Sequence, residues 1–388
     1  MIPGSGGAGG RGGGGNGSGG SSGGLGGCGS GTSPMLMRFP CWCGPQTSVG
    51  RRTVAFGMSV FRRARGLARR GARLHDEDPL IFAGSASPRL AAAICRELRV
   101  EVGASEVIRF SEGTLFVRVL ENVRGRSVYL VQSTVFPTNA NFMELLFWID
   151  AFSRASADSV TVILPYFSYA KGDKKDEPRV SIRARVCADA IEVAGADRVV
   201  TLDLHAPQIQ GFFRVPVDDL YALPYLCAAI ERANLRDPVV VSPDAGFAKR
   251  ARRFARRLDA PLAIADKVRK GHGESAELVE IIGEVAGRDA VVVDDFTISA
   301  GTLVEAADQL VARGARSVTA VVTHGVFAEG SMERLDRSPI ERLIVTDSIE
   351  TQPVELSAKV SVISVAPLFA EAIRRIHQRE SISVLFQD

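Results

Sequence analysis

Two adjacent carboxylates follow a valine-rich run at 290–293 and precede a loop of small and hydroxyl residues. The carboxylates are Asp294 and Asp295, and an amphipathic stretch begins after the loop. The key loop residues are Ser299, Ala300, Gly301 and Thr302. Loop and helix-start N–H groups bind phosphate, whereas carboxylates accept hydrogen bonds from sugar hydroxyls or hold a metal. This pattern indicates a sugar-phosphate site, with a capped helix and a solvated Asp pair as the alternative.

A histidine and a further aspartate follow two other apolar runs. His205 comes directly after the run at 198–204, and Asp244 follows the run at 238–241. A neutral imidazole can bind a metal or contact a nucleotide phosphate, although a lone histidine more often has a structural role. Together, His205 and Asp244 would form a Mg²⁺ or hydroxyl site.

Two basic loops complete the set of candidate residues. The first, at 165–179, contains aromatic residues, Lys171 and Asp173, and suits a polyphosphate with a flanking base. The second, at 266–274, contains Lys267 and Arg269 between glycines and acids. Such a loop is typical of a lid that closes on phosphates and neutralises charge on a transferred group. Solvated charged loops are the alternative reading for this kind of segment.

Short β-branched runs that alternate with helical patterns must position these residues. The clearest predicted strands are 160–164, 198–204, 238–241, 290–293, 317–322 and 342–345. The stretch 301–311 has apolar residues on one helical face. This alternation predicts an α/β fold with mainly parallel sheets. Ligands of such folds bind beyond the carboxyl ends of the strands, which is where the candidate residues stand. Two halves divide near 221–224.

The composition separates a basic leader from an acidic body. Residues 1–75 contain ten Arg and no Lys, Asp or Glu, so they carry +10 and leave −7 for the rest of a chain whose net charge is +3. We therefore expect no nucleic-acid partner, despite the basic pI. Glycine supplies 18 of the first 33 residues, which predicts disorder. The Arg-rich part that follows is typical of a transit peptide, and an unstructured extension or a misassigned start, with Met58 as the true one, are equal alternatives.

Several classes of protein are excluded by what the sequence lacks. No apolar run approaches the length of a membrane span, so we expect a protein of the cytoplasm, unless the leader directs import into an organelle. The six cysteines form no zinc or disulfide pattern. The body contains no P-loop motif, no dinucleotide-binding glycine motif after a strand and no nucleophile elbow.

The order of these segments resembles the ribose-phosphate pyrophosphokinase family over residues 80–388. The stretch 203–218 matches the recognition pattern of the family, and further matches lie at 132–146, 242–246, 323–325 and 372–375. The resemblance implies two phosphoribosyltransferase-like domains, with the C-terminal strand and helix returning to the first. The expected division is a leader at 1–78, a first domain at 79–222 plus 366–388, and a second domain at 223–365. It also implies homo-oligomers, as dimers or rings of dimers such as a hexamer.

The resemblance implies a role for each candidate residue. Ribose 5-phosphate would be bound by Asp244, Asp294, Asp295, Ser299, Ala300, Gly301 and Thr302. ATP would be bound by Phe110, Glu112, Lys171, Asp173 and His205, partly across a subunit boundary. Mg²⁺ would lie at His205 and Asp244, and Lys267 and Arg269 would stabilise the transition state. In the implied reaction the ribose 1-hydroxyl attacks the β-phosphorus of ATP and AMP leaves.

The chain departs from the family pattern at three points. The usual Asp-Thr-Gly-Gly-Thr phosphate loop reads Ile-Ser-Ala-Gly-Thr at 298–302, Lys171-Gly172 replaces Arg-Gln, and Thr114 replaces Glu. The altered nucleotide loop favours one alternative function, a catalytically weak regulatory subunit of an active synthetase. A phosphoribosyltransferase is a second alternative, but it would leave the first half of the body unexplained.

Overall fold

Two sheets organise the chain in the computed structural model, which describes residues 78–268, 278–350 and 353–386. The first sheet has the order β1-β4-β5-β6-β7, and all its neighbouring strands are parallel. Its strands are β1 (Leu80–Ala83), β4 (Ser127–Val131), β5 (Ser159–Leu164), β6 (Arg198–Leu202) and β7 (Val217–Leu220). The predicted leader at 1–78 lies outside the described residues, apart from its last residue.

The second sheet has the order β10-β9-β8-β11-β12-β13-β14, and only its β9–β10 pair is antiparallel. Its strands are β8 (Pro238–Ser242), β9 (Leu262–Val268), β10 (Leu278–Ile282), β11 (Asp289–Thr297), β12 (Ser317–Gly325), β13 (Ile340–Thr346) and β14 (Val360–Ile363). A separate antiparallel hairpin is formed by β2 (Ser105–Arg109) and β3 (Leu115–Val119). The predicted α/β class with mainly parallel sheets is confirmed.

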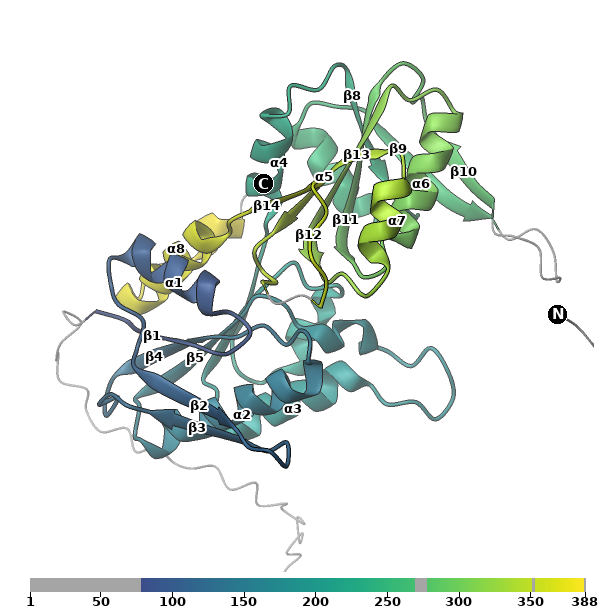
Figure 1. The fold of residues 1–388 in the computed structure, drawn as a ribbon. Coiled ribbons are helices and arrows are strands. Elements are labelled where there is room, and N and C mark those ends of the chain that lie inside the picture. Colours follow the sequence, from purple (N-terminus) through teal and green to yellow (C-terminus); the bar gives the residue numbers. More distant parts are fainter. Residues whose placement is uncertain (1–77, 269–277, 351–352, 387–388) are drawn as a thin grey trace, which may run out of the picture. The chain divides into compact units, whose positions relative to one another are not determined.

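Helices cover the sheets, which are buried on both faces (Figure 1). They are α1 (Pro88–Leu98), α2 (Thr138–Arg154), α3 (Arg183–Ala194), α4 (Leu223–Glu231), α5 (Ala248–Arg257), α6 (Gly301–Ala312), α7 (Ser331–Arg337) and α8 (Ala366–Gln378), with 3₁₀ turns η1 (Ser168–Gly172), η2 (Pro207–Phe212) and η3 (Ser383–Phe386). Neighbouring residues Ile81 and Phe82 point into different cores, as the alternation of a strand requires. No helix within the described ranges is long and apolar enough to cross a membrane.

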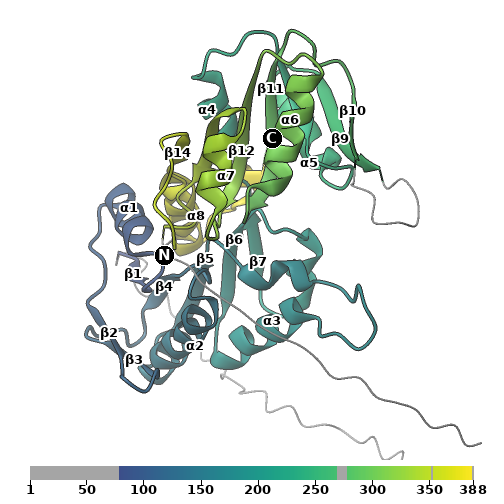
Figure 2. The same cartoon turned by 45° about the vertical axis from the view of Figure 1, so that its right-hand side comes forward.

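The hydrophobic pattern of the sequence predicts some of the strands and misses others. Strands were not predicted at β1, β4, β7, β9 and β10, nor at the β2–β3 hairpin, which packs against α2 (Figure 2). Of these, β1 and β7 have only four residues each. The β7 sequence is Val-Asp-Asp-Leu, so its strand character comes from pairing with β6 rather than from propensity. The predicted runs overlap β5, β6, β8, β11, β12 and β13, whose sequences are mostly apolar.

The C-terminal strand does not return to the first domain, contrary to the expectation from family resemblance. β14 pairs in parallel with β13, and Leu343 is opposite Val360, so the strand completes the second sheet. Pairing there satisfies backbone groups of β13 that would otherwise be left at an open edge. Helix α8, in contrast, lies against α1, which belongs to the first half (Figure 1).

Candidate active site

The carboxyl ends of β6 and β11 bring His205 and Asp295 together from the two sheets. His205 Nδ1 lies 2.7 Å from Asp295 Oδ2. The carboxylate can only accept, so Nδ1 carries a proton and donates the hydrogen bond to Asp295. The Asp295 side chain is only 6% exposed, compared with 42% for His205. Asp295 therefore orients the imidazole through Nδ1, while the other ring nitrogen, Nε2, remains accessible to a ligand.

Arg250, on helix α5, joins these two groups. Its Nη1 lies 3.4 Å from Asp295 Oδ2, and its Nη2 donates to the carbonyl oxygens of Leu204 and, at 3.1 Å, His205. Burial acts to raise the pKa of Asp295, but the hydrogen bond and charge of His205 and the charge of Arg250 outweigh it and lower that pKa. The amide N–H of Phe296 donates to Asp295 Oδ1 at 2.9 Å. Both oxygens of Asp295 are therefore engaged by the protein itself.

Asp294, the half-buried neighbour of Asp295 in β11, has a pKa shifted in the opposite direction. Burial and the charge of Asp295 raise its pKa, with a smaller contribution from Asp244, while the Asp295 N–H that donates to Asp294 Oδ1 at 2.9 Å acts in the opposite direction. Three carboxylates therefore share one electrostatic environment at the ends of β8 and β11. The concentration of negative charge favours a cation or a proton at this point.

Replacing Asp294 by Asn should stabilise the protein at neutral and alkaline pH. The raised pKa means that the folded state binds more protons than the unfolded state, so the contribution of Asp294 to stability is lost as the pH rises. We expect Tm to increase by about 2 °C at pH 8 and by less at pH 5. The control is Asp308→Asn, at an exposed position on α6. Equal gains at both pH values would contradict the prediction.

Two aspartates, half-buried Asp203 and buried Asp219, shape the loop that carries His205. Asp203 has a φ of 42°, and its Oδ2 accepts from the Ala222 N–H at 3.0 Å and from Thr323 Oγ1 at 2.8 Å. Asp219 Oδ1 accepts from the Leu204 N–H at 3.0 Å, and burial raises the pKa of Asp219 to about 7. Aspartate tolerates the left-handed region better than most residues. These contacts fix the turn from β6 into His205.

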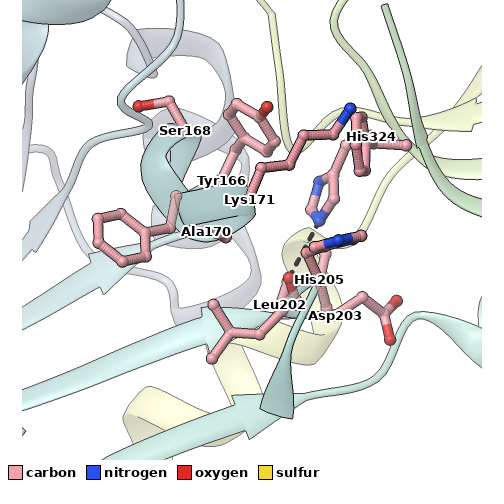
Figure 3. A pocket seen from close by; sticks show the side chains of 11 residues that line it. Tyr166, Ser168, Ala170, Lys171, Leu202, Asp203, His205 and His324 are labelled. Carbon is pink, nitrogen blue, oxygen red and sulfur yellow. Dashed lines mark hydrogen bonds between the residues drawn. The ribbon is translucent and has the colours of Figure 1, made fainter. Parts of the chain in front are cut away.

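His324 joins the same loop to the second sheet. Its Nε2 donates to the Leu202 carbonyl oxygen at 3.0 Å, which leaves Nδ1 to accept from Ser348 Oγ at 2.8 Å. Tyr166 packs on the ring with a centroid distance of 5.1 Å. Figure 3 shows His324 beside His205, with its bond to Leu202 dashed. Burial lowers the pKa of His324 to about 4, so the ring is neutral at physiological pH.

Replacing His324 by Gln should weaken the acid dependence of stability. Between pH 4 and the ordinary imidazole pKa near 6.5, the unfolded chain binds a proton that the folded chain refuses, so the stability that is present above pH 6.5 is lost as the pH falls. A pKa lowered to about 4 corresponds to about 3 kcal/mol of such dependence. Tm measured from pH 4 to pH 7 should therefore vary less in His324→Gln. Parallel curves would show that His324 does not titrate as described.

A pocket beside His205 receives residues from η1 and from both sheets. It is lined by Tyr166, Phe167, Ser168, Ala170, Lys171, Leu202, Asp203, Leu204, His205, Phe296 and His324. Lys171 extends from η1 toward the two histidines (Figure 3), and Asp173 Oδ2 accepts from Gln208 Nε2 at 2.7 Å. Basic and aromatic groups therefore line a hollow next to the carboxylates, which suits a nucleotide polyphosphate.

The predicted phosphate loop leads into α6. Ala300 has a φ of 59° and is followed by Gly301, the first residue of the helix. No side chain caps this end; the N–H of Gly301 donates to Ser299 Oγ at 3.3 Å, while Ser299 and Thr302 are exposed. Arg334 Nη1 holds the Ser299 carbonyl oxygen at 2.8 Å. The start of α6 thus offers backbone donors and a favourable dipole to an anion.

The predicted residues Asp244, Phe110 and Glu112 are not among those that line the pocket beside His205. Asp244 is exposed, and its Oδ1 accepts from the Phe247 N–H at 2.8 Å; the ring of His205 bonds to Asp295 rather than to Asp244. Phe110 and Glu112 follow β2 and are not among the residues that line the pocket. Lys267 lies in β9 opposite Val279, and Arg269 lies outside the described residues.

Sequence reasoning did not assign roles to Arg250, Phe296, Asp219 or His324. Arg250 stands in Ala-Lys-Arg-Ala-Arg-Arg-Phe-Ala-Arg-Arg, where no cation differs visibly from the others. The sequence offers one indication of its role, which is its position six residues after Asp244. Residues in the first turn of a helix that follows a strand end can reach a site at that end. The other three are recognisable only once the strands are aligned.

Comparisons with known proteins agree with this geometry. Residues 79–195 match the family model for the N-terminal domain of ribose phosphate pyrophosphokinase, and residues 274–387 match the model for the phosphoribosyl synthetase-associated domain. The ribose-phosphate pyrophosphokinase of Rhizobium meliloti is 50% identical over 308 residues, which cover 79% of this chain and 99% of that protein. The one of Caldanaerobacter subterraneus is 50% identical over 307 residues, which cover 79% and 97%.

A solved structure gives the same result. The crystal structure of phosphoribosylpyrophosphate synthetase from Mycobacterium smegmatis superimposes with a TM-score of 0.73 and 38% identity, covering 78% of this chain and all of that one. Similarity of this extent in both sequence and structure identifies the family: the chain belongs to the ribose-phosphate pyrophosphokinases.

Proposed function

We propose that this protein transfers the diphosphate group of ATP to the 1-hydroxyl of ribose 5-phosphate, at the ends of β6, β8 and β11. The observation that carries the proposal is the meeting of His205 and Asp295 beside the uncapped start of α6. This region would combine a histidine that faces the nucleotide, a carboxylate that binds the sugar and a helix start that binds an anion. The reaction requires these three elements, because it joins a sugar phosphate to a polyphosphate.

The sugar phosphate would bind at the second sheet. The 5-phosphate would accept from the loop of Ser299, Ala300, Gly301 and Thr302 at the start of α6. Asp294 and Asp244 would accept hydrogen bonds from the ribose hydroxyls. Asp295, whose two oxygens are engaged by His205, Arg250 and the Phe296 N–H, would act by orienting His205 rather than by direct contact with the sugar.

ATP would bind on the side of η1. Lys171 would contact its phosphates, Asp173 would lie at the edge of the nucleotide, and His205 Nε2 would face the reacting phosphates. Phe110 and Glu112 follow β2, away from the residues that line the pocket. A second copy of the chain would therefore supply these two residues, in a dimer or a larger ring such as a hexamer.

The residues fit Mg²⁺ carried by the nucleotide. No group of three or more His, Cys, Asp or Glu side chains within the described ranges could hold a metal alone, and Mg²⁺ is commonly bound by one or two carboxylates plus substrate phosphates. Burial and the nearby charges of Asp295 and Asp244 raise the pKa of Asp294. A bound cation would reduce the repulsion between these carboxylates. Asp244 and His205 would adjoin it, and it would neutralise phosphate charge when bound.

The chain would act mainly by positioning and charge. The ribose 1-hydroxyl would be held in line with the β-phosphorus while AMP departs, and Lys267 and Arg269 would neutralise the charge that develops on the transferred group. The chemistry requires no covalent intermediate with the protein. We place the reaction in the cytoplasm, and the import function of the leader stays a prediction.

The test is AMP release from ATP with Mg²⁺, with and without ribose 5-phosphate. AMP should form only when the sugar phosphate is present, together with an equal amount of 5-phosphoribosyl 1-diphosphate observed by ³¹P NMR. AMP release that does not depend on the sugar would contradict the proposal. Binding of ribose 5-phosphate without turnover would instead favour the regulatory subunit.

A further inference from the structure

Phe296 occupies the point where the sugar side and the nucleotide side of the site meet. It directly follows Asp294 and Asp295 in β11 and lies opposite His324 of β12. The half-buried ring packs against a small apolar cluster of Ala86, Val135, Val326 and Ile349. The ring is therefore anchored in the structure and is not a freely rotating surface group.

Two functional groups from the first half of the body rest on this one ring. Lys171 Nζ lies 3.9 Å from the ring centroid, in cation–π geometry. The imidazole of His205 meets the ring edge-on, with centroids 5.5 Å apart and an interplanar angle of 80°. Lys171 comes from η1 and His205 from the end of β6, so a residue of the second sheet fixes the relative positions of two separate loops.

The contact with Phe296 restricts the flexible side chain of Lys171 in the nucleotide loop. A lysine ammonium is a point charge on a flexible stem, and fixing that stem costs rotamer entropy. An aromatic face attracts the cation and restricts it before a phosphate arrives. Asp294 and Asp295 add a second attraction, since their charges act to raise the pKa of Lys171 against the lowering caused by burial.

We propose that Phe296 is a positioning residue for the nucleotide, which holds the Lys171 ammonium and the His205 imidazole in the arrangement that receives the ATP phosphates. The inference rests on the proposed function, because it assigns the cation to the polyphosphate. Loss of the ring should release Lys171 and raise KM for ATP, while the start of α6, which binds the sugar phosphate, should be little affected.

A double-mutant cycle of Phe296→Leu and Lys171→Met tests the proposal. In the full-length protein, Phe296→Leu should raise KM for ATP by about fivefold, the scale of a partly buried cation–π contact, and change KM for ribose 5-phosphate by less than about twofold. In the Lys171→Met background the same substitution should have much less effect on KM for ATP. Phe296→Tyr keeps the aromatic face and should restore KM for ATP close to the unmodified value.

A second measurement does not depend on turnover. Reductive ¹³C-methylation of the lysines, with Lys171→Arg used for assignment, should give a Lys171 methyl signal that the Phe296 ring current shifts upfield. The shift should disappear in Phe296→Leu and persist in Phe296→Tyr. If the unmodified protein shows no turnover, the proposed function fails, while this signal still reports whether the contact exists.

Three results would overturn the inference. One is an equal rise in KM for ATP on Phe296→Leu whether or not Lys171 is present, because the ring would then act independently of the cation. Another is a Lys171 methyl signal without an upfield shift in the methylated protein, provided that methylation leaves Tm unchanged. Equal increases in KM for both substrates would likewise show that Phe296 supports the whole site and not the nucleotide in particular.

Discussion

Replacing Arg250 by Met should lower kcat/KM by about 100-fold and reduce the free energy of unfolding by about 3 kcal/mol, the cost of removing one partner of a buried ion pair. Arg250 bonds to Asp295, which is 6% exposed, and to two carbonyl oxygens of the loop that ends β6. Without it, Asp295 loses the guanidinium that lies 3.4 Å from its Oδ2. The pKa of Asp295 should then rise, and the imidazole should lose its fixed orientation.

Two further variants distinguish positioning from a general loss of charge. Arg252→Met removes an exposed cation from the same helix and should leave kcat/KM within about twofold, since an isolated surface charge contributes little. Arg250→Lys keeps the charge, but one ammonium cannot replace a planar guanidinium that serves three acceptors. Its pH–rate profile should show an acid limb shifted to higher pH. An unshifted limb in both Arg250 variants would show that Arg250 does not control the Asp295–His205 pair.

The parallel sheets were predictable because their central strands are continuous apolar runs. The predicted run 290–293 lies in the first half of β11, and 317–322 makes up most of β12. The residues of strand β14, Val-Ser-Val-Ile, fit either sheet. The expected second domain at 223–365 includes this strand, whereas the family resemblance implied its return to the first domain. Its pairing with β13 is decided by an open edge, and an open edge is a property of the assembled fold that no local pattern records.

The sequence predicted which strand ends form the candidate site, but not which of its side chains bond to one another. His205 and Asp295 are 90 residues apart, and nothing in their local sequence says that they bond. The altered nucleotide loop has a structural explanation that became visible only in the fold. A Cβ on Gly172 would lie 2.7 Å from Arg183 Nε, so the glycine makes room for Arg183. Compensation of this kind depends on three-dimensional proximity.

Replacing Lys267 by Ala should have the largest effect on the chemical step. The proposal places Lys267 near charge that develops only as the diphosphate moves, and removal of one such group typically costs about 10²–10³-fold in kcat. KM for ATP and for ribose 5-phosphate should stay within about threefold, because an interaction made mainly in the transition state contributes little to ground-state binding. Single-turnover release of AMP, with both substrates saturating, measures this step directly.

The matched control is Lys249→Ala, which removes an exposed lysine of α5 and should leave the single-turnover rate unchanged. Lys267→Arg keeps the positive charge and should recover part of the rate, whereas Lys267→Met keeps only the stem and should not. If Lys267→Ala raised both KM values and left kcat unchanged, Lys267 would be a ground-state binding residue. The charge that stabilises the transition state would then have to come from other cations, and Arg269 would be the next residue to replace.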